Sequence, residues 1–173
     1  DFVDVIAPLL PIVAERGVKL VTNAGGVNPR ACAAALEAAA ARAGVKLKIG
    51  TVLGDDLMDR LDELEAKGVR LDNMETGASY ATVRGRVLSA NAYFGAWPIV
   101  EALRQGAQIV VTGRATDTGI TLAPMIHEFG WGPGDLDKLA SGIIAGHIIE
   151  CGAQATGGNF TDWQLVPSFS NIG

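Results

Sequence analysis

Short hydrophobic runs alternate with amphipathic segments along the whole chain. The runs predict buried strands at Val18–Val21, Val45–Leu53, Arg86–Asn91 and Gln108–Thr112. Segments with apolar residues at helical spacing predict helices at Asp1–Arg16, Pro29–Ala43, Leu57–Lys67, Trp97–Gln105, Gly119–Phe129 and Asp135–Cys151. Strands that alternate with crossover helices indicate an α/β fold, a three-layer domain with a mainly parallel sheet and helices on both faces. We expect residues 1–173 to form a single domain of this class and to be part of a longer protein.

Residues near the helix ends support these predictions. Asn28 is an N-cap residue, Pro29 suits the first helical position, and Gly44 follows the predicted end of that helix. Pro8 and Pro11 predict a disturbed start for the first helix, because proline inside a helix removes a hydrogen bond and clashes with the preceding turn.

Composition narrows the class of protein. The chain has 173 residues, of which 49% are hydrophobic and 19% charged, so it can bury one sizeable core. Its net charge of −5 is spread over mixed clusters, which argues against nucleic-acid binding. No apolar run approaches the ~20 residues of a membrane span, so we expect no membrane segment. Cys32 and Cys151 lack metal or redox spacing, which favours free thiols in a reducing cytoplasm, and neither a metal nor a cofactor is predicted.

Small and polar residues follow each predicted strand, at Thr22–Gly26, Gly54–Asp56, Asn91–Tyr93 and Gly113–Asp117. The carboxyl ends of parallel strands meet at one edge of a sheet, where open α/β sheets bind ligands. We therefore expect these four segments to form one ligand-binding rim, with the Asn91 amide among its binding groups.

The loop "TNAGGVNP" has two interpretations. In the first, it is a strand-to-helix turn that Gly25 and Gly26 make and Asn28 caps. In the second, Asn23, Gly25, Gly26 and Asn28 bring backbone N–H groups and a helix N-terminus against a carboxylate or phosphate. The loop lacks the dinucleotide fingerprint and the P-loop pattern, so neither NAD nor ATP is inferred.

Charged residues of the rim are candidates for binding and catalysis. We expect either Asp55 or Asp56 to cap the following helix, and the other to act as a base or to bind a cation. Arg114 has the planar fork that binds carboxylate or phosphate. Asp117 is a candidate partner of Arg114, helix cap or catalytic carboxylate.

The segment "AGHIIECG" places His147, Glu150 and Cys151 at neighbouring positions of one helix face. A histidine–carboxylate pair is a candidate general base, and the thiol a candidate nucleophile if its pKa were lowered. The alternative is a structural role among the surrounding isoleucines. Gly142 and Gly146 predict close helix packing here. The tail "QATGGNF" repeats the small-residue pattern of the first loop, so Gly157, Gly158 and Asn159 are candidates for a second backbone cradle.

Taken in order, these motifs resemble the acyclic terpene utilisation (AtuA) family, over nearly the whole chain: NAGGVNP, GDD, ANAYFGAWPIVEAL, IVVTGRATD, HEFGW and AGHIIECGAQATGGNF. The resemblance implies a cytoplasmic role in the breakdown of acyclic isoprenoids such as citronellol and geraniol through acyl-CoA intermediates. It implies no particular reaction. Family members usually begin earlier, with another strand and glycine-rich loop, and continue past this tail.

The expected function is that of a catabolic enzyme acting on a small acidic or acyl-CoA-type metabolite by proton transfer next to a carbonyl, as in a hydratase, isomerase or lyase. Asp55, Asp117, His147 and Glu150 are the acid/base candidates, and Arg114 with the Asn23–Asn28 loop would hold the anionic part. The alternative is a non-catalytic ligand-binding or scaffold subunit of the same pathway. Either function is compatible with a homo-oligomer.

Overall fold

The computed structural model describes residues 2–156, 162–168 and 170. Its helices are α1 (Phe2–Ile6), α2 (Leu10–Arg16), α3 (Pro29–Arg42), α4 (Leu61–Ala66), α5 (Trp97–Arg104), α6 (Gly119–Phe129) and α7 (Leu136–Cys151). Its strands are β1 (Leu20–Thr22), β2 (Ile49–Val52) and β3 (Ile109–Thr112). Short 3-10 segments lie at Ala7–Leu9, Met58–Arg60, Tyr80–Thr82, Arg84–Arg86, Gly152–Thr156 and Trp163–Leu165.

The strands form a parallel sheet in the order β1-β3-β2. Ile109 of the central strand β3 pairs with Leu20 on one side and with Ile49 on the other. All four residues of β3 are buried, as expected for a central strand with helices on both faces. The predicted α/β class with a parallel sheet is therefore confirmed.

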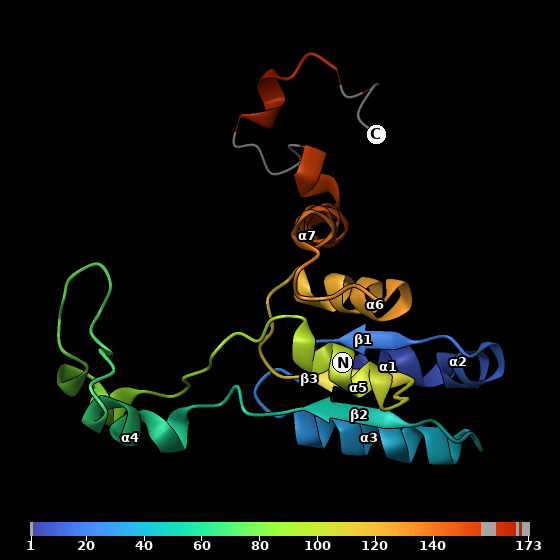
Figure 1. The fold of residues 1–173 in the computed structure, drawn as a ribbon, viewed down its shortest axis with the longest axis horizontal. Helices are drawn as coiled ribbons and strands as arrows, with labels where there is room; N and C mark the ends of the chain where they lie inside the picture. The colour runs from blue at the N-terminus through green and yellow to red at the C-terminus, as the bar shows by residue number, and fades with distance from the viewer. Residues whose placement is uncertain (1, 157–161, 169, 171–173) are drawn as a thin grey trace.

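Successive side chains of each strand point to opposite faces, which divides the core in two. Val110 and Val52 pack with α5 and α6 on one face. Ile109 and Val111 pack with α1, α2 and α3 on the other (Figure 1). Helix α7 lies outside these layers and packs against α6.

The predicted strand at Arg86–Asn91 is wrong. Within the described residues, Asn91 forms only an isolated antiparallel bridge with Asp56, and Leu88 is 93% exposed. Residues 57–90, here called the arm, extend away from the sheet (Figure 1). Among the described residues the sheet consists of β1, β3 and β2, and this short apolar run is not one of its strands.

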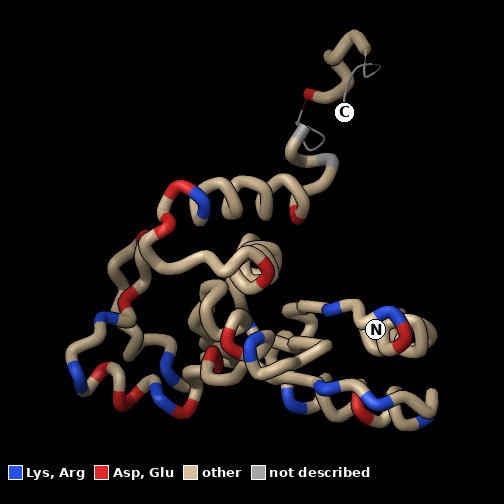
Figure 2. The backbone as a smooth tube through the Cα atoms, turned by 45° about the vertical axis from the view of Figure 1, so that its right-hand side comes forward, with Lys and Arg blue, Asp and Glu red and all other residues tan. Residues whose placement is uncertain are grey.

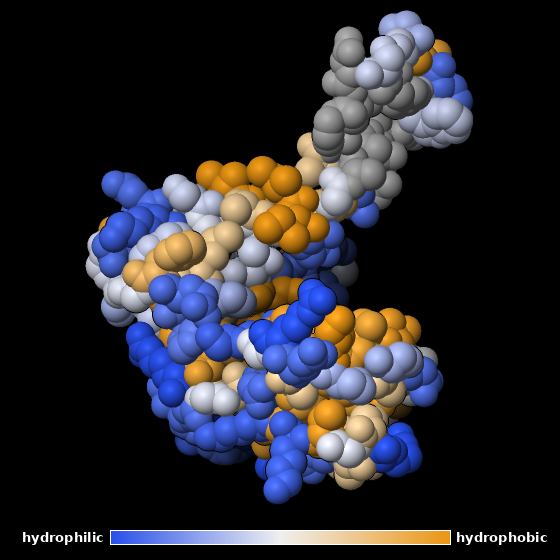
Figure 3. Space-filling model, turned by 90° about the vertical axis from the view of Figure 1, so that its right-hand side faces the viewer, coloured by the Kyte–Doolittle hydropathy of each residue, from blue (hydrophilic) through white to orange (hydrophobic). Residues whose placement is uncertain are grey.

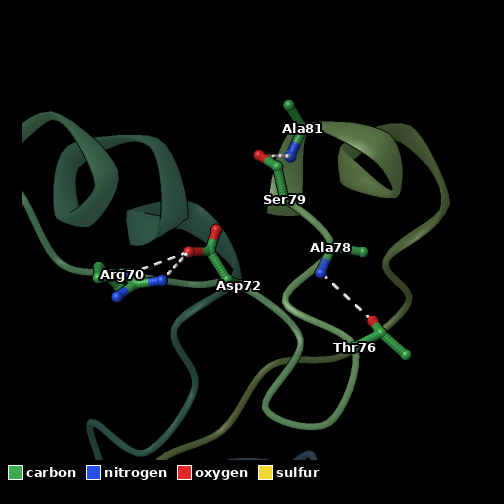
Figure 4. Close-up of polar contacts among 6 residues, drawn as sticks. All are labelled: Arg70, Asp72, Thr76, Ala78, Ser79 and Ala81. Carbon is green, nitrogen blue, oxygen red and sulfur yellow. Dashed lines mark hydrogen bonds and ion pairs between the residues drawn. The ribbon is translucent and has the colours of Figure 1, made fainter.

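The arm is held together mainly by local polar contacts. Arg70 donates to Asp72, Ala78 N–H to the Thr76 hydroxyl, and Ala81 N–H to the Ser79 hydroxyl (Figure 4). Charged residues of both signs follow one another along it (Figure 2). Two backbone hydrogen bonds join its ends, Leu57 N–H to Ala90 O and Ala92 N–H to Asp55 O, each 2.8 Å long. The arm therefore enters and leaves the body of the molecule through one narrow neck.

The predicted helices are found, with two details that follow from particular residues. A 3-10 turn that contains Pro8 separates α1 from α2, as the prolines predicted. Close packing at Gly142 and Gly146 is confirmed: a Cβ at Gly142 would lie 2.6 Å from Leu122 Cδ1, and one at Gly146 would lie 3.1 Å from Thr118 Cα.

The isoleucines of α7 do not form a core around His147. The side chains of Ile143, Ile144, Ile148 and Ile149 are exposed and contribute to a hydrophobic surface at the level of α7 (Figure 3). Among the described residues, no helix is both long and apolar enough to cross a membrane.

Candidate functional site

Asp55, three residues beyond the end of β2, is the hub of the carboxyl edge of the sheet. Its side chain is buried, and its Oδ2 accepts hydrogen bonds from Arg114 N–H at 2.8 Å and from Asn91 Nδ2–H at 3.1 Å. Its backbone oxygen accepts from Ala92 N–H. Asp55 therefore connects the ends of β2 and β3 to the neck of the arm.

Gly113 makes room for this carboxylate. A Cβ on Gly113 would lie 2.2 Å from Asp55 Oδ2 and 2.4 Å from Asp55 Cγ, far inside contact distance. The pattern "GDD" predicted that one aspartate caps and the other is free. Asp56 Oδ1 accepts from Met58 N–H at 3.0 Å, just before the 3-10 segment Met58–Arg60, whereas the N-cap residue of α4 is Arg60, which makes no side-chain cap hydrogen bond. Asp55 Oδ2 is already occupied by two donors.

The loop between β1 and α3 is a tight turn. Asn28 Oδ1 accepts from Ala31 N–H at 3.0 Å and so caps α3 as predicted. A Cβ on Gly25 would lie 2.3 Å from Thr112 O, so only glycine lets the loop approach the end of β3. Gly26 has φ of +54°, which glycine adopts without strain. Both glycines thus have a structural reason, and anion binding by this loop stays a prediction.

A cavity of about 290 Å³ opens beside this turn. The start of α3, including Asn28 and Arg30, lines one side, and Gly54, Asp55 and Asp56 line the other. The Arg30 guanidinium, which our sequence analysis did not single out, is exposed there. The sequence could have indicated this position, because Arg30 is the second residue of the helix that begins at Pro29.

Arg114 stands on the same edge, directly after Gly113. Its guanidinium donates to the Tyr93 hydroxyl and lies 4.9 Å from the centre of the Tyr93 ring. Both side chains are exposed, so the ring supports a cation that still faces solvent. An arginine held in this way still has guanidinium N–H groups that can donate to a carboxylate or phosphate.

The motifs IVVTGRATD and AGHIIECG meet at the junction of α6 and α7. Gly146 packs on Thr118 at the start of α6, next to Asp117. The negative charge of Asp117 makes a small contribution to the raised pKa of the Cys151 thiol. His147, Glu150 and Asp117 are all exposed.

The Cys151 thiol donates to Glu150 Oε2 at 3.1 Å. This hydrogen bond, then partial burial and the charges of Glu150 and Asp117, raise the pKa of Cys151 above its usual value. In the part of the chain that the structure describes, Glu150 makes no hydrogen bond to His147. The geometry opposes a reactive thiolate and leaves the imidazole facing solvent.

The predicted binding residues not yet described are Asn23 and the three residues of the tail motif. Asn23 lies in the turn after β1, where its backbone oxygen accepts from Gly26 N–H at 3.1 Å. Gly157, Gly158 and Asn159 lie outside the described residues. Over residues 2–156, 162–168 and 170, no group of three His, Cys, Asp or Glu side chains is arranged to hold a metal ion.

The fold and site define an α/β protein with a polar rim, at the carboxyl edge of a parallel sheet, that Asp55 holds together. The sequence model of the acyclic terpene utilisation family protein AtuA matches residues 1–173. The chain therefore belongs to the AtuA family, which connects it with acyclic terpene utilisation. Comparisons with curated proteins and with solved structures gave no match.

Proposed function

We propose that the rim binds a small carboxylate or acyl-CoA-type intermediate of acyclic terpene breakdown in the cytoplasm and transfers a proton next to its carbonyl group. Arg114 and the Asn23–Asn28 loop hold the anionic part of the substrate. Asp117 and His147 exchange the proton, and Asp55 positions the rim. The reaction belongs to the hydratase, isomerase or lyase class.

One observation carries this proposal: Asp55 fastens Asn91 and the Arg114 backbone at the ends of two parallel strands. Three segments distant in sequence thereby present polar groups at one edge, beside the cavity of about 290 Å³. Membership of the acyclic terpene utilisation family supports a substrate that carries a branched apolar chain, and we propose that this chain reaches the rim as a carboxylate or thioester. An arginine supported by an aromatic ring suits the anionic end of such a molecule.

Binding is tested by calorimetric titration with the coenzyme A thioester of geranic acid and, separately, with geranic acid. Arg114→Gln should weaken binding about tenfold or more, the loss expected when a charge-assisted hydrogen-bond pair is removed. Arg104→Gln, at the end of α5 away from the rim, is the matched control. Equal effects of the two substitutions would contradict the assignment of Arg114.

Proton transfer is tested by deuterium incorporation next to the thioester carbonyl in heavy water. Asp117→Asn or His147→Gln should slow the exchange by ~10²-fold or more, as for acid/base groups. Cys151→Ala should retain most of the rate because the raised pKa of its thiol disfavours the nucleophilic form. A rate that falls only in the cysteine variant would reverse these assignments.

A second candidate function is a non-catalytic ligand-binding or scaffold subunit of the pathway. The observation that favours it is the exposure of Asp117, His147 and Glu150, because acid/base groups usually work in closed clefts. Thioester binding that depends on Arg114, without any exchange above the uncatalysed rate, would select this function.

A further inference from the structure

Tyr93 lies in a short segment that is fastened to the carboxyl edge of the sheet on both sides. Before it, Ala92 N–H donates to Asp55 O at 2.8 Å. After it, Phe94 N–H donates to Arg114 O at 3.1 Å. The backbone of Tyr93 is therefore held beside that of Arg114, at the edge that forms the rim.

The hydrogen bond between these two side chains has only one possible direction. A guanidinium carries N–H donors and no acceptor, whereas a phenol hydroxyl both donates and accepts. Arg114 donates and the Tyr93 oxygen accepts, which leaves the proton of the Tyr93 hydroxyl for another partner. Among the described residues no acceptor takes this proton, and Tyr93 is 56% exposed. The adjacent positive charge polarises the hydroxyl and strengthens it as a donor.

Two kinds of donor thus lie side by side where the pair faces solvent. The remaining guanidinium N–H groups and the Tyr93 O–H are separated by one hydrogen bond, a spacing similar to that of two oxygens in a carboxylate or phosphate group. The Tyr93 ring, whose centre lies 4.9 Å from the guanidinium carbon, also restricts the Arg114 side chain. A side chain that is already restricted loses less conformational freedom when a ligand binds.

The other tyrosine of the chain has different surroundings. Arg84 lies 5.3 Å from the centre of the Tyr80 ring, and Tyr80 is only 8% exposed. The Arg84 guanidinium forms ion pairs with Asp62 and Glu65, so its charge is neutralised within the arm. By contrast, no carboxylate of the described residues forms an ion pair with Arg114. The two tyrosine–arginine pairs therefore differ in whether the cation is available to a ligand.

We propose that Tyr93 is a further binding residue of the rim, whose hydroxyl donates to the same two-oxygen anion as the Arg114 guanidinium. This inference rests on the proposed function, in which Arg114 holds the anionic part of the substrate. The anion is the carboxylate of a free acid or a phosphate of coenzyme A. A neutral amide offers one acceptor oxygen and no charge, so the pair selects anions over it.

The test is calorimetric titration with three ligands: geranic acid, coenzyme A without an acyl chain, and the primary amide of geranic acid. Tyr93→Phe keeps the ring and removes the O–H group, so it should weaken binding of the anion about tenfold. The loss falls on geranic acid if the anion is the carboxylate, and on coenzyme A if it is a phosphate. Affinity for the amide should change less than about twofold.

Tyr80→Phe is the matched control, because it makes the same chemical change at the tyrosine whose arginine is already paired. It should leave all three affinities within about twofold. Tyr93→Leu also removes the ring and should weaken anion binding about threefold more than Tyr93→Phe. In an Arg114→Gln background this additional loss should disappear, because the ring acts through the guanidinium.

The outcomes separate this inference from the function on which it rests. If Arg114→Gln weakens binding of an anion and Tyr93→Phe does not, the role of Tyr93 is overturned and the proposed function stands. A loss in Tyr93→Phe that is equally large for the amide also overturns it, because a disturbed fold would produce that result. If Arg114→Gln has no effect, or if neither anion binds the wild-type chain, the proposed function fails and this inference fails with it.

Discussion

Substitution of Gly113 by alanine tests whether Asp55 is the hub of the rim. An alanine Cβ would lie 2.2–2.4 Å from the Asp55 carboxylate, so the carboxylate must move and lose its hydrogen bonds from Arg114 N–H and Asn91. Each hydrogen bond to a charged group contributes about 1.5–3 kcal/mol. We therefore expect Gly113→Ala to lower the free energy of unfolding by about 3–5 kcal/mol, a large part of a typical 5–15 kcal/mol.

A double-mutant cycle with Asp55→Ala identifies the cause. Asp55→Ala should itself cost about 3–5 kcal/mol, because it leaves the two donors without their acceptor. Once the carboxylate is absent, a Cβ at position 113 has room, so adding Gly113→Ala should cost at most about 1 kcal/mol more. The coupling between the two substitutions is then about 2–4 kcal/mol.

The measurement is urea unfolding followed by tryptophan fluorescence and far-UV circular dichroism. Gly95→Ala is the control: a Cβ there would meet no heavy atom within 4 Å, and its cost should stay below about 0.5 kcal/mol. Additive effects of Gly113→Ala and Asp55→Ala, or a cost of Gly113→Ala no larger than that of the control, would refute the reasoning.

Two further predictions follow from single contacts. Asn28→Ala removes the cap on Ala31 N–H and should lower the free energy of unfolding by about 1 kcal/mol, whereas Asn28→Asp should keep it; thermal melts measure both, and equal losses would contradict the cap. The raised pKa of Cys151 predicts slow alkylation by iodoacetamide at pH 8 and a rate that climbs only at a pH above the usual range of a cysteine thiol, because thiolate is the reactive form. Glu150→Gln should lower that pKa and speed labelling at pH 8 several-fold, and an unchanged rate would show that Glu150 is not its cause.

Features that depend on neighbours in sequence could be predicted without the structure. Asn28 and Pro29 start α3 because capping and a fixed φ act within one turn of the chain. The spacing of Gly142 and Gly146 indicated the close contact of α7, because residues four apart share a helix face. Local patterns also indicated the parallel α/β class.

Partners distant in sequence decided the rest. The apolar run before Asn91 resembles a strand, but a strand exists only where another strand offers hydrogen bonds, and within the described residues this run forms one bridge, between Asn91 and Asp56. Asp55 was expected to be either a cap or a free base. Only the folded chain brings Gly113 and the Asn91 amide around it, because a buried carboxylate needs space and donors that residues 36 and more positions away supply. The sequence alone therefore indicated that Asp55, Asn91 and Arg114 meet at one edge of the sheet, and tertiary contacts decided that Asp55 holds them together.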